Sequence, residues 1–331
     1  MSSTRMRLIG LAGASVLALS ATTAAVAQDE YPSEDISIMA PGGAGGGWDG
    51  TARAMQAALE SGVIDQQVNV YNRGGAAGTI GLAQFVNDFE ADPHQLMVMG
   101  RVMVGGILLN ESEATLADIT PIASLTTEYE AIAVAADSPY ETLADLVAAF
   151  EADPTGTVWV GGSAGGTDHM VVARIAQELG INPRDVNYIP TAGGGELIPA
   201  MLSGDAAAGV SGTSEFAGQI ASGDLRLLAV SSAERIDGID APTITEATGL
   251  PVEVSNWRGV VATAGLSPEN EAAVVAMVEE MHATDSWKQS LEANQWTDFI
   301  QTGEDFQAFL AQEDETVTKI LQQIELIPSD G

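Results

Sequence analysis

Glycine-rich segments hold most of the residues whose types and spacing suggest chemistry. Five of them follow a short apolar run and precede a helical pattern, at 41–50, 72–79, 161–168, 191–196 and 211–214. Where such a loop opens a helix, backbone N–H groups without intrahelical partners attract an anion. Ligands of open parallel sheets bind beyond the carboxyl ends of the strands. The five loops therefore predict one pocket lined by main-chain amides.

The segment Gly45–Gly50 also matches the dinucleotide pattern G-x-G-x-x-G between a predicted strand and a predicted helix. A nucleotide site of this kind needs an acidic residue about twenty residues further on, which holds the ribose hydroxyl. The sequence there reads Tyr71-Asn72-Arg73 and offers no acid. We therefore expect no cofactor.

The segment Gly161–Gly165 matches G-x-S-x-G, the nucleophile elbow of serine hydrolases, so a secreted esterase using Ser163 is the main alternative to a binding protein. Only His169 and His282 follow Ser163 as possible bases. His169 is six residues on, in the first turn of a predicted helix, which is a poor position for triad geometry. His282 ends an amphipathic helix and is expected at the surface. We therefore expect a protein that is not an enzyme and has no catalytic residue.

The sequence has few residues of the types that bind transition metals. The sequence has three histidines, at 94, 169 and 282, and no cysteine, which gives no ligand set for a transition metal. Asp49 and Asp168 stand at predicted helix starts, where an aspartate usually accepts N–H bonds as a cap. We expect no metal site.

The elements that must position the loops alternate between β-branched runs and helical patterns, which predicts an α/β fold with a mainly parallel sheet. The predicted strands are 36–40, 68–71, 96–99, 132–135, 158–160, 186–189, 207–210, 225–230 and 259–262. The predicted helices are 49–59, 77–89, 142–151, 168–179, 194–202, 215–221, 268–281, 287–293 and 304–324.

The N-terminus has the three parts of a secretory signal: Arg5 and Arg7, an apolar run, and small residues ending at Ala27. We expect a signal peptide over 1–27, cleavage near Ala27 and a periplasmic protein. The chain carries 12 Lys and Arg against 46 Asp and Glu, a formal charge of −34. Nucleic acid is therefore an unsuitable partner, because phosphate backbones are bound by basic patches.

Four segments resemble, in order, the extracytoplasmic receptors of tripartite tricarboxylate transporters, and the citrate-receptor branch in particular. They are Pro41–Gln56 with its Gly-Gly-Trp-Asp sequence, Asn72-Arg73 with the following glycines, Gly162–His169, and Asn256–Val260 with Trp-Arg-Gly. The similarity extends over essentially the whole chain after the signal, which makes it far more specific than either short motif above.

The resemblance implies a two-domain periplasmic binding protein of type II, or Venus flytrap, built from two sheets flanked by helices. One domain would combine 28–127 with 255–331, and the other would be 128–254, joined by two crossing strands that act as a hinge. It also implies an organic di- or tricarboxylate ligand similar to citrate, delivery to integral membrane permease subunits, and no chemical turnover. We expect a monomer.

Carried over from the family, the ligand-binding residues lie in the first strand-to-helix loop of each domain, with a few neighbours. They are Gly42, Gly43, Gly45, Gly46, Gly47, Trp48, Asp49, Thr79, Ser163, Ala164, Gly165, Gly166, Thr167, Asp168, His169, Gly194 and Ser211.

Two positions depart from the family pattern. Arg101 stands where an apolar residue is common, and Thr213 where an aromatic is common. We include Arg101 among the ligand-binding residues, since it would pair a carboxylate bidentately. For Trp257 and Arg258 we expect packing at the hinge.

An acidic protein can still hold an anion, because backbone amides at helix starts supply hydrogen bonds and the positive end of the helix dipole without a lysine. Glycines at 42, 43, 45, 46 and 47 remove the side chains that would obstruct close approach.

Overall fold

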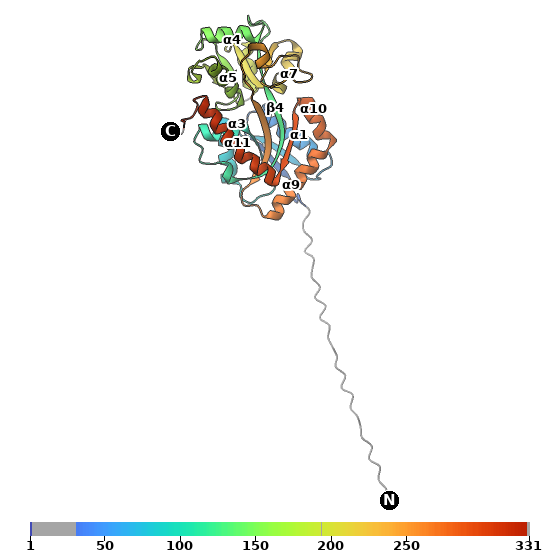
Figure 1. The fold of residues 1–331 in the computed structure, drawn as a ribbon. Helices are drawn as coiled ribbons and strands as arrows, with labels where there is room; N and C mark the ends of the chain where they lie inside the picture. The colour runs from blue at the N-terminus through green and yellow to red at the C-terminus, as the bar shows by residue number, and fades with distance from the viewer. Residues whose placement is uncertain (2–30, 193, 330–331) are drawn as a thin grey trace. The chain divides into compact units, whose positions relative to one another are not determined.

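One long strand organises the fold. In the computed structural model, which describes residues 1, 31–192 and 194–329, β4 (Ile119–Ala135) pairs with strands of two separate groups. Its residues 119–129 pair with β9 (Ser255–Thr263), and residues 130–135 pair with β7 (Ala208–Gly212) and β8 (Leu225–Val230). Figure 1 shows β4 extending from the α4, α5 and α7 region to the region of α1, α3 and α11.

The first strand group contains β1 (Ile36–Ala40) between β2 (Val68–Asn72) and β3 (Gln95–Gly100), all parallel. β3 continues antiparallel to β9, and β10 (Thr297–Thr302) is antiparallel to β4. In the second group β5 (Trp159–Gly161) lies parallel between β7 and β6 (Tyr188–Pro190). Among the strands described, every antiparallel pairing involves β4 or β9. The sheet is therefore more mixed than the predicted parallel pattern, because these two strands link the groups.

A helix follows each described strand, and α10 follows α9. The helices are α1 (Gly47–Leu59), α2 (Thr79–Asp88), α3 (Arg101–Leu109), α4 (Leu143–Ala152), α5 (Thr167–Glu178), α6 (Gly194–Leu202), α7 (Thr213–Ser222), α8 (Ile244–Thr248), α9 (Pro268–Ala283), α10 (Asp285–Asn294) and α11 (Gly303–Gln323). All nine predicted strands are present, the fourth as the end of β4. The sequence patterns did not indicate α3, α8 or β10.

Burial explains why these segments fold as they do. β1 is apolar at almost every position because both of its faces are covered, as expected for an inner parallel strand. On α1, Met55 and Leu59 are four residues apart and both fully buried, in one core with Ile36 and Ile38 of β1. This packing fixes the start of α1 at the carboxyl end of β1.

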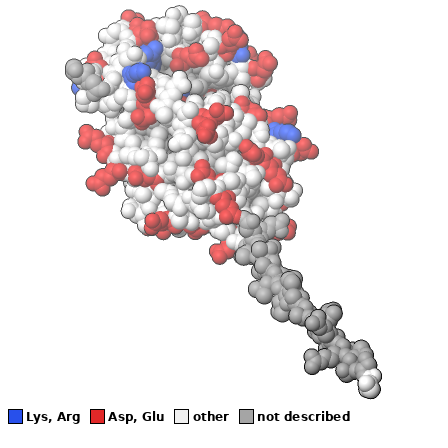
Figure 2. Space-filling view, turned by 60° about the horizontal axis from the view of Figure 1, so that its bottom comes forward, with Lys and Arg blue, Asp and Glu red and all other residues white. Residues whose placement is uncertain are grey.

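The predicted signal peptide, 1–27, and its cleavage near Ala27 lie outside the described residues apart from Met1. In the part of the chain that the structure describes, no helix is long and apolar enough to cross a membrane. Acidic side chains are spread over the face in Figure 2, with few basic ones between them. The compact unit to which the fold belongs spans Tyr31–Gly331.

Candidate functional site

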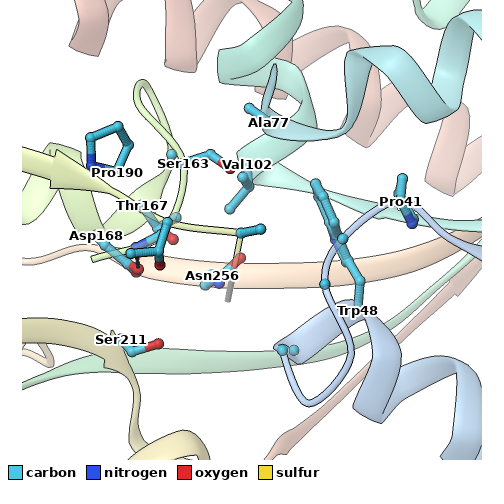
Figure 3. A pocket seen from close by; sticks show the side chains of 18 of the residues that line it. Pro41, Trp48, Ala77, Val102, Ser163, Thr167, Asp168, Pro190, Ser211 and Asn256 are labelled. Carbon is cyan, nitrogen blue, oxygen red and sulfur yellow. Dashed lines mark hydrogen bonds between the residues drawn. The ribbon is translucent and has the colours of Figure 1, made fainter. Parts of the chain in front are cut away.

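A cavity of about 340 Å³ lies where the two strand groups meet. Its walls come from the loop before α1, the loop before α5, the start of α7 and the strand β9. Figure 3 shows Trp48 facing this space from one wall and Ser163 with Thr167 from the other, while Asn256 lies between them. Segments far apart in the sequence thus form one site.

The first wall is the loop from Pro41 to Trp48. Asp49 holds it from inside the helix, because its carboxylate accepts the Gly45 N–H and the Arg53 Nε–H, both at 3.0 Å. Burial acts to raise the pKa of Asp49, but the hydrogen bonds from Arg53 and Gly45 outweigh it and lower that pKa. Asp49 itself does not line the cavity. Its function in the structure is to fix the loop.

The second wall is the loop from Gly162 to Thr167, and it is built in the same way. Asp168 accepts the Gly162 N–H at 2.5 Å, and the Gly165 N–H donates to Nδ1 of His169 at 3.2 Å. Gly165 has φ +77°, a conformation that other residues rarely adopt, and a Cβ there would lie 2.8 Å from Leu109. Glycine is therefore required at this turn.

Helices α1 and α5 both begin at the cavity, with Gly47 and Thr167 as their first residues and as lining residues. The first N–H groups of a helix have no partner within it, and the helix dipole makes that end positive. Two such ends facing one cavity create a site for an anionic group. A carboxylate has the charge and the acceptor geometry for it.

Arg258 of β9 adds a cation at the same wall. It lines the cavity, and a methyl group at Gly47 would overlap its guanidinium, so the two are in direct contact. The guanidinium pairs with Glu128 of β4, and both side chains are almost fully buried. Nη1 of Arg258 is buried and has no hydrogen-bond partner within the described residues.

Carboxyl groups form the floor of the cavity. Asp168 and Glu215 line it, and Glu130 lies fully buried behind them on β4. Burial raises the pKa of Asp168 to about 7, and the charge of Glu215 adds to this. Burial also raises the pKa of Glu215 to about 7, against the lowering effect of Arg258. The pKa of Glu130 is raised well above its usual value by burial and by the adjacent Asp168.

The structure brings most of the predicted site residues to the cavity. Those lining it are Gly42, Gly43, Gly46, Gly47, Trp48, Ser163, Ala164, Gly166, Thr167, Asp168 and Ser211. Trp48 also packs against its own part of the fold, since a Cβ at Gly42 would lie 3.1 Å from its ring. That these residues bind a ligand remains a prediction.

Other predicted residues lie behind those that line the cavity. Gly45, Asp49, Gly165 and His169 shape the two loops, as described above. Thr79 begins α2 and donates its hydroxyl to the Ala76 carbonyl at 2.8 Å. Gly194 begins α6.

Arg101 was predicted to bind the ligand, but the structure does not place it at the cavity. Its guanidinium binds both carboxylate oxygens of Glu313 on α11, at 2.9 and 2.8 Å, and donates to the Ser255 carbonyl at 2.7 Å. It is not a lining residue. Arg101 is the first residue of α3, and Glu313 is itself buried in α11, so the ion pair turns the side chain toward that helix.

Several lining residues were missed, chiefly Glu215, Asn256 and Arg258. Asn256 and Arg258 were recognised as part of a motif, but Asn256 was given no role in the site and Arg258 was assigned to hinge packing. They alternate on β9, and this period of two places both on the face turned to the cavity. Glu215 escaped notice because an acid in the first turn of a helix usually only complements the helix dipole.

The site does not have the arrangement of a serine hydrolase. Nδ1 of His169 accepts the Gly165 amide, its ring stacks on Tyr188 at 4.3 Å, and burial lowers its pKa to about 4. Among the described side chains, no hydrogen bond joins Ser163 to His169. The same part of the chain contains no group of three acids or histidines suited to hold a metal ion.

Comparisons with known proteins agree with this description. The sequence profile of the tripartite tricarboxylate transporter family receptor matches residues 51–326. The UPF0065 protein in the TAR-I ttuE-ttuC' intergenic region of Agrobacterium vitis is 30% identical over 244 residues, 72% of this chain and 68% of that protein.

Two solved structures share the fold. The periplasmic binding protein BugD superposes with a TM-score of 0.81 at 21% identity, over 89% of this chain and 99% of BugD. Rpa4515 of R. palustris, solved with adipate, gives a TM-score of 0.81 at 22% identity, over 89% of this chain and 98% of its own.

The α/β fold and the cavity between its two strand groups define a solute receptor of the periplasmic binding protein class. The family profile covers well over half of the chain. This protein therefore belongs to the tripartite tricarboxylate transporter receptor family, whose members are solute-binding receptors and not enzymes.

Proposed function

We propose that this receptor captures a small di- or tricarboxylate similar to citrate and delivers it to the membrane permease of a tripartite tricarboxylate transporter. The observation that carries the proposal is the convergence of the α1 and α5 N-termini on one cavity, with the Arg258 guanidinium beside the first of them. One carboxylate of the ligand would accept hydrogen bonds from these amides. The adipate bound to the structural relative Rpa4515 is a ligand of this class.

The two strand groups would act as the two domains of a hinged receptor. One domain would combine residues 28–127 and 255–331, and the other would be residues 128–254. The pairing of β4 supports this division, since its partners change from β9 to β7 between Tyr129 and Glu130. Ligand contacts from both sides would favour the closed state, because a ligand shifts a conformational equilibrium by its differential affinity. The protein would work as a periplasmic monomer, exported by the signal at 1–27.

Isothermal titration calorimetry tests the proposal. The purified mature protein is titrated with citrate, tricarballylate, succinate and adipate at fixed ionic strength, with neutral sugars of similar size as controls. We expect saturable binding of at least one acid and none of the sugars. Absence of binding by every carboxylate, in protein shown to be folded by its cooperative melting, would refute the proposed ligand class.

A further inference from the structure

Helix α3 contains two consecutive glycines, Gly105 and Gly106, among its nine residues. Glycine is one of the least favourable residues inside a helix, because it loses the most backbone freedom when the chain folds. Each of the two glycines therefore needs a packing reason. For Gly106 the reason is local, since a Cβ there would lie 2.6 Å from Cβ of Ala77, in the same half of the fold.

The reason for Gly105 lies in the other half of the fold. A Cβ on Gly105 would lie 2.2 Å from the carbonyl oxygen of Gly165, in the loop that follows β5, and 3.2 Å from Cε of Met170 on α5. The position of a Cβ is fixed by the backbone, and the first obstacle is itself main chain, so no change of rotamer relieves the overlap. Only a glycine lets the two halves approach so closely at this point.

The neighbouring residues of the helix extend this contact. Val102, Gly105 and Leu109 are spaced by three and four positions and therefore share one face of the helix, which we call the α3 face. A Cβ at Gly166 would lie 3.1 Å from Cγ1 of Val102, and a Cβ at Gly165 would lie 2.8 Å from Cδ2 of Leu109. Val102 also lines the cavity, as Figure 3 shows. The α3 face thus continues a wall of the cavity onto the loop before α5.

Helix α3 has no room to move aside. Its first residue, Arg101, is bound to Glu313 of α11 by two charged hydrogen bonds. Gly106 already lies against Ala77. A side chain at Gly105 would therefore be accommodated by moving the second half of the fold away, and not by a shift of the helix within the first half.

The loop that meets the α3 face is fixed as well. The Gly165 N–H donates to Nδ1 of His169 at 3.2 Å, and the Gly166 N–H donates to the carbonyl of Ser163 at 3.0 Å. Ser163, Gly166 and Thr167 line the cavity. Because the loop holds its own shape, its contact with the α3 face decides where the first amides of α5 stand relative to the opposite wall.

A second contact between the halves has the same form. The Gly43 N–H donates to the carbonyl of Ala192 at 2.9 Å, and a Cβ on Gly43 would also lie 2.9 Å from that oxygen. In both contacts a carbonyl oxygen of the second half meets a glycine of the first. Gly43 lines the cavity, so its replacement would also disturb the ligand directly. Gly105 does not line it, which makes Gly105 the better position for an experiment.

We propose that the α3 face is the surface onto which the loop before α5 closes, and that Gly105 is the positioning residue that permits full closure. The inference rests on the proposed function, since only a hinged receptor opens and closes. Gly105→Ala should then favour the open state, while α3 itself gains a better helix former. If the two halves were instead packed together permanently, the same overlap would lower the stability of the whole protein.

Disulfide cross-linking measures closure without any ligand. The sequence contains no cysteine, so a pair introduced as Val102→Cys and Gly166→Cys can form only one intramolecular bond. The distance of 3.1 Å between Cγ1 of Val102 and a Cβ at Gly166 places the two positions within disulfide reach. The protein is treated with oxidised glutathione, and the rate of bond formation is followed by mass spectrometry.

We expect the disulfide to form in the two-cysteine protein. Adding Gly105→Ala should slow its formation about tenfold or more, because the rate follows the population of the closed state. Adding Gly218→Ala should leave the rate unchanged. That control places the same methyl group on α7, where nothing lies within 4 Å of it.

Calorimetry and melting curves complete the test in proteins without the cysteines. The unaltered protein, Gly105→Ala and Gly218→Ala are titrated with citrate, tricarballylate, succinate and adipate. Each acid that binds the unaltered protein should bind Gly105→Ala about tenfold or more weakly, and Gly218→Ala with the original affinity. The melting temperature of free Gly105→Ala should not fall, which a purely structural role of Gly105 would not allow.

An unchanged cross-linking rate and unchanged affinities in Gly105→Ala would overturn the inference and leave the proposed function standing. A lower melting temperature with an unchanged cross-linking rate would overturn it too, because Gly105 would then be an ordinary packing contact. So would the absence of any disulfide in the two-cysteine protein. Failure of every acid to bind the unaltered protein would count against the proposed function, and the cross-linking rates would still show whether Gly105 controls closure.

Discussion

Arg258 and Glu128 form an ion pair at the crossing of β9 and β4, and their side chains are only 4% and 0% exposed. The strands pair with Arg258 opposite Thr126 and Asn256 opposite Glu128, so the ion pair is a diagonal one across the ladder. Its guanidinium also contacts Gly47 at the start of α1. One pair thus joins the crossing strands to the loop proposed to bind the ligand.

Removing one partner of this ion pair should destabilise the protein strongly. In Arg258→Met the Glu128 carboxylate would stay buried without its cation, and we expect the free energy of unfolding to fall by about 3–5 kcal/mol. Urea denaturation measures this. The control is Arg235→Met, which breaks the ion pair with Glu246. The side chain of Arg235 is 57% exposed and that of Glu246 is 47% exposed. That loss should be about 1 kcal/mol or less, and equal losses would contradict our account.

A single methyl group should disturb the anion site. Gly47→Ala places a Cβ where the Arg258 guanidinium now lies, and Glu128 holds that guanidinium in place. We expect carboxylate affinity to fall about tenfold or more, measured by calorimetry. Gly218→Ala on α7 is the matched control, because nothing lies within 4 Å of its Cβ. Unchanged affinity in Gly47→Ala would argue against ligand binding at the start of α1.

The stability of the free receptor should fall as the solution becomes less acidic. In the folded protein the pKa values of Asp168 and Glu215 are both about 7, whereas in the unfolded chain they are near 4. Between about pH 4 and pH 7 the folded state retains protons that the unfolded state has lost, so the free energy of unfolding decreases with rising pH. Above about pH 7 this contribution is constant.

Melting temperatures between pH 5 and pH 8 test this dependence. Asp168→Asn should reduce the slope, because the amide does not titrate and its oxygen can still accept the Gly162 N–H. Repulsion among surface acids acts in the same direction, so the exposed variant Glu280→Gln shows how much of the slope belongs to the surface. An identical slope in both variants would contradict the assignment to the cavity floor.

Arg101 should matter for stability and not for affinity. Arg101→Met would leave the buried Glu313 carboxylate without its two charged hydrogen bonds, and we expect a loss of about 1.5–3 kcal/mol in the free energy of unfolding. Ligand affinity should stay within about twofold of the original, because Arg101 does not line the cavity. A large loss of affinity in a folded variant would restore the ligand-binding role that the sequence suggested.

Local patterns predicted much of the fold. Apolar runs located eight of the nine predicted strands within a few residues, because an inner strand covered on both faces must be apolar. The fourth run located only the last residues of β4, which begins at Ile119. Helix α3 was missed because Gly105 and Gly106 interrupt its pattern. Those glycines are needed for close packing, since a Cβ at Gly106 would lie 2.6 Å from Ala77. Only tertiary contacts reveal that requirement.

The two glycine loops were recognisable because main-chain binding leaves a sequence signature. The acidic floor of the cavity could not be recognised from the sequence, because Glu128 and Glu130 look like ordinary alternating residues of an exposed strand. Their burial depends on α5, α7 and β9, which are distant in the sequence. The direction of the Arg101 side chain could not be predicted for the same reason, since its partner Glu313 is 212 positions away.

The proposed binding by backbone amides at the N-termini of α1 and α5 would separate affinity from selectivity. Almost any residue supplies an N–H group, so exchanges of side chains elsewhere in the cavity leave this binding capacity intact. A receptor built in this way can acquire a new solute through one or two replacements on its floor, while the machinery that recognises an acid is inherited unchanged.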